Sequence, residues 1–230
     1  MDSLKLDLHV HTIYSGDALI TPEIALKYAK MRKLDGFAIT DHDTLRAYNI
    51  LKKKNENSDL IIIPGMEINT HIGEILALFI NEEISIKDNQ FQVVADDIRE
   101  KNGLIVVPHP FDFLRDNHLK LKMLNDQMIK HYLDGIEIIN SRIMFKSCIK
   151  KARKFNQKYK LFETGGSDAH LKQEIGNGYT LINNVPDRSL ESIRKSLLSK
   201  KSLSKGKLSP GYVHLITIIN KIKKGLYFQQ

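Results

Sequence analysis

The chain has 230 residues, of which 42% are hydrophobic, so it is long and apolar enough to bury the core of one sizeable domain. Its 35 Lys and Arg against 27 Asp and Glu give a formal net charge of +8, which favours phosphorylated or other polyanionic ligands. A single cysteine, Cys148, excludes an internal disulfide, and neither a signal segment nor an apolar run of roughly 18 residues is present, so we expect a cytoplasmic protein without a transmembrane segment.

The first predicted strand carries two histidines on one face. In this strand Leu4, Leu6, Leu8 and Val10 alternate with Lys5, Asp7, His9 and His11. Because side chains of a strand alternate, His9 and His11 are expected on the face opposite the leucines. Two such imidazoles can bind one metal ion, although a lone pair is also typical of a solvated strand face. A metal site therefore depends on ligands from later segments.

The following segments alternate between helix and strand. Helices are predicted at 22–33, 44–57, 91–103, from about 119 to 132, at 145–159 and at 190–198, and strands at 36–40, 60–64, 75–80, 104–107, 135–139, 161–164 and 179–182. Such alternation with short connections favours a parallel sheet covered by helices, and about seven units favour a closed barrel over an open sheet. Because the lysines are scattered over these helices, they indicate solvated faces more than a nucleic-acid groove.

Residues 201–230 differ in composition and are predicted to be a C-terminal extension to a barrel of residues 1–200. After a Ser-Pro-Gly break at 209–211, one helical stripe is apolar: Val213, Ile216, Ile219 and Ile222. We expect this amphipathic helix to pack on the barrel or on a second subunit. The alternative is a basic helix lying on a membrane surface. The oligomeric state stays open.

Side chains that bind metals gather at the predicted strand ends. They are His9, His11, Asp17, His42, Glu67, His109, Asp168 and His170. Alone, each is more typical of a structural role, but histidines of a protein core would not sort in this way by chance. The joint pattern predicts a metal site of several ions at the C-terminal ends of the strands. The other histidines, which match no motif, are expected to be surface or structural residues: His71, His118, His131 and His214.

Five motifs in order resemble those of the polymerase and histidinol phosphatase (PHP) superfamily of metal-dependent phosphoesterases: D-L-H-V-H-T, T-D-H-D, G-M-E-I, P-H-P and G-S-D-A-H. The resemblance covers residues 4 to about 182. It implies an α/β fold, a distorted seven-stranded (β/α)7 TIM-like barrel, with two or three divalent ions at the C-terminal ends of the strands. Mixed imidazole and carboxylate ligands suit Zn, Mn or Fe without choosing among them.

The resemblance also implies how the ions share their ligands. The implied sets are His9, His11, Glu67 and Asp168 for one ion, Glu67 and His109 for a second, and Asp17, His42 and His170 for a third. Related members often have histidine where Glu74 and Asn140 stand here. Glu74 can still bind a metal and is included among the ligands, whereas Asn140 would be a weak ligand, so a site with two ions stays open.

The chemistry of a phosphoester explains this choice of side chains. Its cleavage needs an activated water and cations around an anionic transition state, and paired metal ions supply both. No catalytic side chain is therefore assigned beyond a metal-bound water. Arg142 is a candidate phosphate clamp, because guanidinium matches phosphate oxygens, and Asn140 is a second candidate for substrate binding. At least one of Asp41 and Asp43, which flank His42, is expected to orient an imidazole.

The predicted function is a metal-dependent phosphoric ester hydrolase acting on a phosphomonoester or nucleotide-type substrate, such as a nucleotide or short oligonucleotide. Histidinol-phosphatase-like and exonuclease activities stay open within the same superfamily. The departures at Glu74 and Asn140 motivate a different class, a metal-stabilised binding module whose catalysis has decayed. Hydrolysis of a C–N bond is a third hypothesis, which rests on analogy of site architecture alone.

Overall fold

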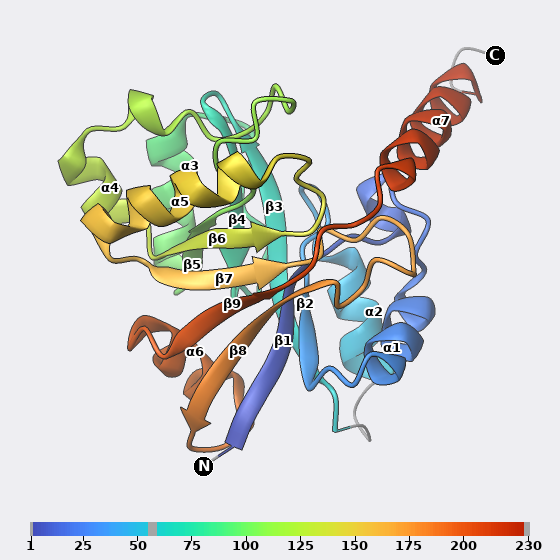
Figure 1. Cartoon of the computed structure of the whole chain (residues 1–230), viewed down its shortest axis with the longest axis horizontal. Helices are drawn as coiled ribbons and strands as arrows, with labels where there is room; N and C mark the ends of the chain where they lie inside the picture. The colour runs from blue at the N-terminus through green and yellow to red at the C-terminus, as the bar shows by residue number, and fades with distance from the viewer. Residues whose placement is uncertain (1, 55–58, 228–230) are drawn as a thin grey trace.

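The computed structural model describes residues 2–54 and 59–227, and in this part of the chain nine strands form one mixed sheet (Figure 1). Along the sheet their order is β7-β6-β5-β4-β3-β2-β1-β8-β9. The strands are β1 (Asp2–Val10), β2 (Gly36–Ile39), β3 (Ile61–Thr70), β4 (Gly73–Leu78), β5 (Leu104–Val107), β6 (Gly135–Asn140), β7 (Phe162–Gly166), β8 (Gly178–Val185) and β9 (Ser202–Gly206).

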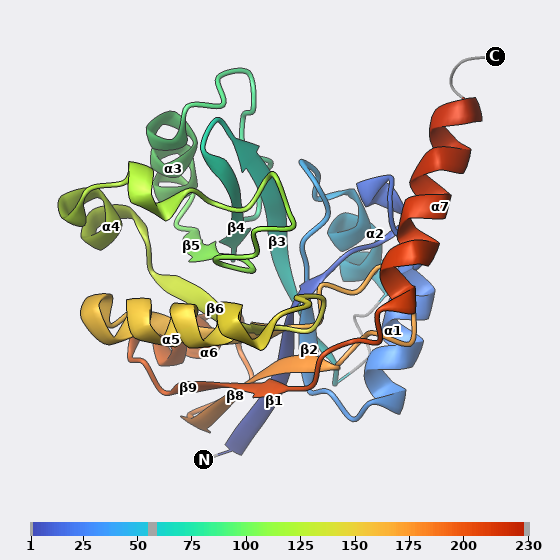
Figure 2. The same ribbon diagram turned by 45° about the horizontal axis from the view of Figure 1, so that its top comes forward.

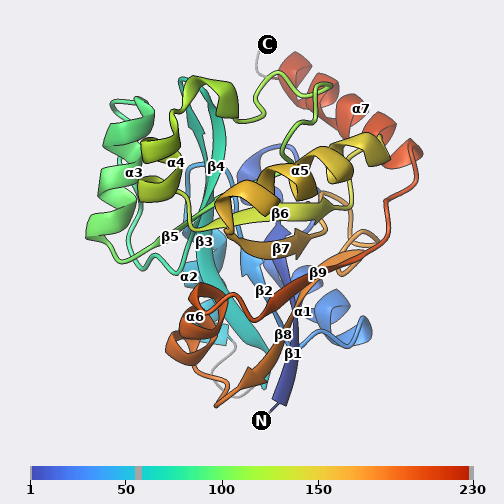
Figure 3. The same ribbon diagram turned by 60° about the vertical axis from the view of Figure 1, so that its left-hand side comes forward.

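The sheet curls until its two ends almost meet. The hydroxyl of Thr180 on β8 donates to the carbonyl of Gly165 on β7 at 3.0 Å, and just past β7 the N–H of Asp168 donates to the carbonyl of His9 on β1 at 2.8 Å. Figure 3 shows β7 lying beside β8 and β9 at this closure. The predicted α/β barrel is therefore confirmed as a nearly closed, barrel-shaped sheet.

The exact (β/α)7 repeat is wrong, because three strands run antiparallel to their neighbours. β4 is antiparallel to β3 and β5, β8 to β1, and β9 to β8. Gly73, with φ of 121°, follows a tight turn in which the Thr70 hydroxyl donates to the Gly73 carbonyl at 2.6 Å. Glycine tolerates this backbone conformation, so the chain returns at once and no crossover helix separates β3 from β4.

Helices cover the outside of this sheet. They are α1 (Pro22–Met31), α2 (Arg46–Lys54), α3 (Phe91–Glu100), α4 (Asp126–Tyr132), α5 (Lys146–Tyr159), α6 (Leu190–Leu198) and α7 (Tyr212–Tyr227), with short 3-10 turns η1 (Ile13–Ser15) and η2 (Leu121–Met123). In Figure 1, α1 and α2 lie on one side of the barrel and α3, α4 and α5 on the other. The end of the helix predicted at 44–57 lies outside the described residues, and the one predicted from about 119 is replaced by η2 followed by α4.

The interior of the barrel is apolar along the strands and polar at their C-terminal ends. Leu4, Leu6 and Leu8 are at most 1% exposed and pack in the interior cluster with residues of β3, β4 and α6. The register of β1 against β2 shifts between Asp7 and Val10, and beyond this irregularity Val10 packs in a different cluster with α1 and α2. Such a bulge re-aims the side chains that follow it, which here include His9.

β9 and α7 make up the predicted C-terminal extension. β9 pairs with β8 in the barrel sheet, although its sequence is polar: Ser202 and Ser204 are buried while Leu203 is 45% exposed. The boundary of the extension at residue 200 stays a prediction. In the described part of the chain, no helix has the length and apolar character needed to span a membrane.

α7 packs on the barrel only through its first turns, and its far end extends away (Figures 1 and 2). Val213 is fully buried, but Ile219 and Ile222 of the predicted apolar stripe are 51% and 56% exposed. The buried face continues instead through Thr217, which is polar and 7% exposed. Contact with a second subunit or a membrane stays a prediction.

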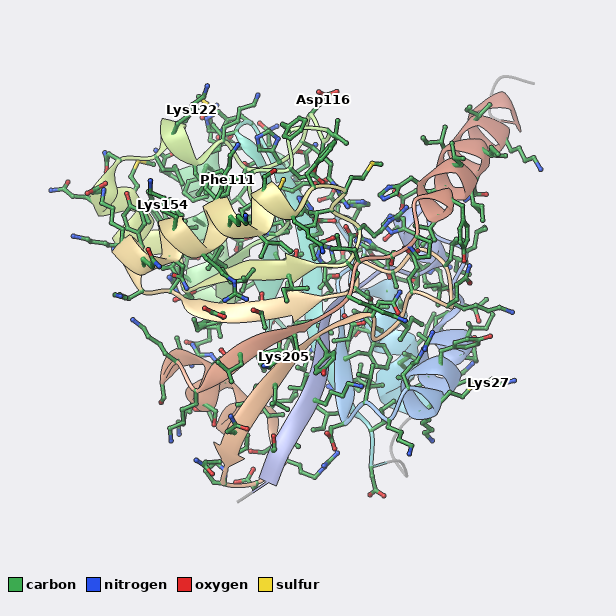
Figure 4. All side chains as sticks on the ribbon, viewed as in Figure 1. Lys27, Phe111, Asp116, Lys122, Lys154 and Lys205 are labelled. Atoms are coloured by element: carbon green, nitrogen blue, oxygen red, sulfur yellow. The ribbon has the colours of Figure 1, made fainter. Side chains whose placement is uncertain are left out.

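The positive charge is spread over the surface. Lys27 on α1 is exposed and lies on the opposite side of the molecule from the exposed Lys122 on η2 and Lys154 on α5 (Figure 4). These lysines therefore do not form one common basic groove.

Candidate metal centre and substrate pocket

All nine predicted metal ligands meet at one end of the barrel. His9 and His11 come from the end of β1, His42 follows β2, Glu67 lies on β3, Glu74 on β4, His109 follows β5, Asp168 and His170 follow β7, and Asp17 follows η1. Parallel strands bring their carboxyl ends to one edge, and the β3–β4 hairpin adds Glu74 from an antiparallel strand.

The Glu67 carboxylate lies at the middle of the cluster. Its Oε2 is 3.2 Å from His11 Nε2 and 3.5 Å from His9 Nε2, while its Oε1 is 3.0 Å from His109 Nε2. His42 Nδ1 is 3.6 Å from Glu67 Oε2. A carboxylate with imidazoles near both oxygens has the arrangement needed to bridge two cations.

A second part of the cluster forms around Asp168 and Asp17. Asp168 Oδ1 is 3.5 Å from both His11 Nε2 and His170 Nδ1. Asp17 Oδ2 is 3.2 Å from His170 Nε2 and 3.9 Å from His42 Nε2. Five overlapping groups have their donor atoms within 4.8 Å of one another: His9–His11–Glu67, His9–His109–Asp168, His11–Asp17–His42, His11–Asp168–His170 and His42–Glu67–Glu74. His11 thus stands between the first and third ligand sets implied by the sequence.

The burial of these groups fits a bound cation. Glu67, Glu74 and Asp168 are at most 2% exposed. Within the described part of the chain, Glu74 Oε2 and Asp168 Oδ1 are buried without a hydrogen-bond partner. Buried carboxylate oxygens without partners are costly, and divalent ions that accept mixed imidazole and oxygen ligands would satisfy these two atoms.

The pKa values of the candidate ligands also fit a bound cation. Burial, together with the charge of Glu67, raises the pKa of Glu74 to about 9. Burial alone would lower the pKa of His9, but Glu67 and Asp168 outweigh it and raise that pKa well above its ordinary value. Metal ligands must be deprotonated, so ion binding here would release protons from Glu74 and His9. His170 is ready to bind, because burial and the charge of His11 lower its pKa to about 4.

Two further carboxylates, Glu137 and Asp41, support the candidate histidine ligands through hydrogen bonds. Glu137 on β6 places Oε1 at 3.3 Å from the His9 ring nitrogen Nδ1. Its Oε2 accepts the backbone N–H of His109 at 2.7 Å. Asp41 accepts the Ser15 hydroxyl at 2.8 Å, and the same hydroxyl is 2.8 Å from His11 Nδ1. Asp41 therefore reaches an imidazole through Ser15. Asp43 is exposed and lines a separate groove.

The side-chain amide of Asn140 is engaged inside the site. Its Nδ2 donates to Glu137 Oε2 at 2.9 Å and to Asp168 Oδ2 at 3.1 Å. Its Oδ1 accepts the N–H of Arg142 at 2.8 Å. Asn140 thus supports two carboxylates at the position where related members often have a histidine, and its role in substrate binding stays a prediction.

A pocket of about 290 Å³ opens onto the cluster. Its walls are Asp17, His42, Glu67, Glu74, Leu114, Arg115, Asn117, Arg142, His170, His214, Thr217 and Ile218. Arg142 is 4% exposed and donates to the Thr217 hydroxyl at 2.8 Å, with its Nε 3.5 Å from Glu174 Oε1. Arg115 contacts Asp168 and lies with its Nε 3.3 Å from Asp112 Oδ2. Two guanidinium groups therefore face a site rich in carboxylates.

Sequence reasoning missed three of these residues. Glu137 interrupts the apolar run Ile-Glu-Ile-Ile of a buried strand, and that isolated charge was a readable signal. Arg115 comes from the irregular segment 111–120, which has no readable pattern. His214, expected to be a surface or structural histidine, lines the pocket because the first turns of α7 pack on the barrel beside the loops after β6 and η1.

The chain is similar to known proteins in sequence and in fold. Residues 149–202 match the PHP-associated family. The protein MJ0417 of Methanocaldococcus jannaschii is 36% identical over 177 residues, which cover 76% of this chain and 69% of that protein. This chain belongs to the PHP superfamily.

Two further similar proteins carry descriptive names. A protein of Caldicellulosiruptor bescii named "probable phosphatase" is 26% identical over 201 residues, covering 75% of this chain and 82% of that protein. A two-domain protein of Bacteroides vulgatus, said to contain a predicted PHP-like metal-dependent phosphoesterase, superimposes with a TM-score of 0.76 at 19% identity. The superposition covers 90% of this chain but only 65% of the Bacteroides chain, and at this identity it shows a shared fold.

Removing the metal should make stability depend on the protonation of Glu74. Its pKa is about 9 in the folded protein against an ordinary value of 4.5, so between these values the folded state keeps a proton that the unfolded state loses. The free energy of unfolding of chelator-treated protein should therefore fall as pH rises, by on the order of 1 kcal/mol per pH unit. Glu74→Gln should flatten this slope in urea titrations, and the exposed control Glu82→Gln should not. An equal slope in both variants would contradict the assignment.

Proposed function

We propose that the chain is a metal-dependent phosphoric ester hydrolase that cleaves a phosphomonoester or nucleotide-type substrate, with short oligonucleotides included in that class. Two or three divalent ions, Zn, Mn or Fe, would be held by His9, His11, Asp17, His42, Glu67, Glu74, His109, Asp168 and His170. The observation that carries the proposal is the Glu67 carboxylate, set among imidazoles at the floor of a pocket whose wall includes two arginines.

The bound ions would supply an activated water and cations that stabilise the anionic transition state. The chain's own residues hold that site in shape. Glu137 fixes His9 and the backbone of His109, and Asp41 fixes His11 through Ser15. Such supporting hydrogen bonds set the ring orientation and tautomer of metal-binding imidazoles.

Arg142 is proposed to bind the phosphoryl group. Its side chain is buried at the pocket wall, where one terminal nitrogen donates to Thr217 and Nε lies 3.5 Å from Glu174 Oε1. A guanidinium held in place in this way can bind phosphate oxygens in a fixed geometry through its other N–H groups. Arg115 lies on the same pocket wall beside Asp168 and adds positive charge there.

The names of the relatives support hydrolysis of a phosphoester over the other classes. The Caldicellulosiruptor protein is named a "probable phosphatase", and the Bacteroides protein is said to contain a predicted PHP-like metal-dependent phosphoesterase. A binding module with decayed catalysis remains the rival. It requires the metal to stabilise the fold while phosphoesters are left intact.

The proposal is tested by elemental analysis of the purified protein, joined to hydrolysis of a generic phosphomonoester and a dinucleotide with and without added Mn or Zn. We expect two or three ions per chain and product release that a chelator abolishes. Bound metal that raises the melting temperature without turnover of either substrate would favour the binding module. Protein without bound metal under these conditions would contradict the whole metal centre.

A further inference from the structure

α7 is attached to the barrel at the rim of the substrate pocket. The Thr217 hydroxyl accepts a hydrogen bond from Arg142 at 2.8 Å, and the Asn220 amide donates to the carbonyl of Asp17 at 3.2 Å. Val213, one turn before Thr217, is fully buried. These contacts join the first turns of α7 to the loops after β6 and η1, while the far end of the helix extends away from the barrel (Figure 2). Residues His214, Thr217 and Ile218 of α7 line the pocket.

The pocket is lined by two chemically different sets of side chains. One set is the candidate metal ligands and the arginines, whereas Leu114 and Ile218 are apolar lining residues that are 54% and 53% exposed. Leu114 comes from the loop after β5 and Ile218 from α7. Two exposed apolar side chains on the lining of one polar pocket are typical of a contact with an apolar part of a ligand.

His214 lies one turn before Ile218 and lines the same pocket. Burial, together with the positive charges of Arg142 and Arg115, lowers its pKa below the ordinary value. A neutral imidazole can hydrogen-bond a substrate without adding to the positive charge that already serves the phosphate. α7 thus contributes neutral and apolar groups to a pocket whose charge comes from the barrel.

We propose that α7 determines the substrate class: the enzyme takes a phosphomonoester whose organic group presents an apolar face, and this face packs between Leu114 and Ile218. The inference rests on the proposed function for its phosphate end. It goes further in assigning the organic end to a helix that lies beyond the resemblance at residues 4–182. A pocket of about 290 Å³ suits a small substrate with a single ring or a short branched chain.

The test uses two phosphonates that cannot be hydrolysed, methylphosphonate and benzylphosphonate, titrated calorimetrically into the metal-loaded full chain. The benzyl compound should bind about tenfold more tightly, because it adds buried apolar area at the organic end. Ile218→Ala should lose most of this preference while methylphosphonate binding stays unchanged. The matched control is Ile219→Ala, the next residue of α7, which is 51% exposed and is not among the lining residues.

Three outcomes separate this inference from the proposed function. Equal affinity of the wild type for the two phosphonates, or an equal loss in the Ile218 and Ile219 variants, would overturn the role of α7 only. Binding of neither phosphonate would contradict the phosphate site and the inference with it. Selective binding of benzylphosphonate by a protein that hydrolyses no phosphomonoester would uphold the α7 pocket and refute the hydrolase.

Discussion

Glu67→Gln is expected to lower metal-dependent turnover on the order of a thousandfold and to reduce the metal content of the purified protein. Both Glu67 oxygens lie within 3.5 Å of imidazole nitrogens, so each oxygen of this carboxylate is placed beside candidate metal ligands. Glutamine keeps the shape but removes the negative charge and one of the two oxygen ligands.

The measurements are metal per chain, by elemental analysis, and kcat/KM for the phosphomonoester. The matched control is Glu191→Gln, an exposed carboxylate whose Oε1 lies 3.2 Å from Lys195 Nζ, and it should behave as the wild type. Thermal unfolding separates loss of metal from loss of fold. A Glu67→Gln protein with full metal content and full turnover would refute the central role of this residue.

Arg142→Met should lower kcat/KM about a hundredfold while the metal content stays unchanged. The reason is that guanidinium binds phosphate oxygens through paired donors, and Met keeps the apolar stem but supplies none of them. Because Arg142 also lies 3.5 Å from the buried carboxylate of Glu174, the Met variant is expected to lose some stability as well.

Arg142→Lys is the control for the loss of stability, because it keeps a positive charge beside Glu174. It should restore stability but recover only part of kcat/KM, because ammonium cannot make the paired contact. Arg46→Met, which removes an exposed guanidinium that lies over the Tyr14 ring, is the surface control. Wild-type kcat/KM in the Lys and Met variants alike would show that Arg142 does not bind the phosphoryl group.

Most helices and strands could be predicted from the sequence, because caps, prolines and hydrophobic periodicity are set by neighbouring residues. Thr21 caps α1 by accepting the Ile24 N–H at 3.3 Å, and Pro22 begins the helix, as the pair predicts. β9 could not be read, because its buried residues are serines and its leucine faces outward. What makes it a strand is the partner β8, together with the Ser204 hydroxyl that donates to Glu163 at 3.1 Å.

The sequence by itself determined which side chains are candidate metal ligands and that strand ends would present them, because residue type and strand-end position are local properties of His9, His42 and His109. Only the tertiary structure decided which of these side chains lie close to one another. Closure of the sheet brings Asp168 to His11, and the packing of the first turns of α7 on the barrel brings His214 and Ile218 to the pocket. Such contacts join residues far apart along the chain, and their formation depends on how the whole core packs, which no local pattern records.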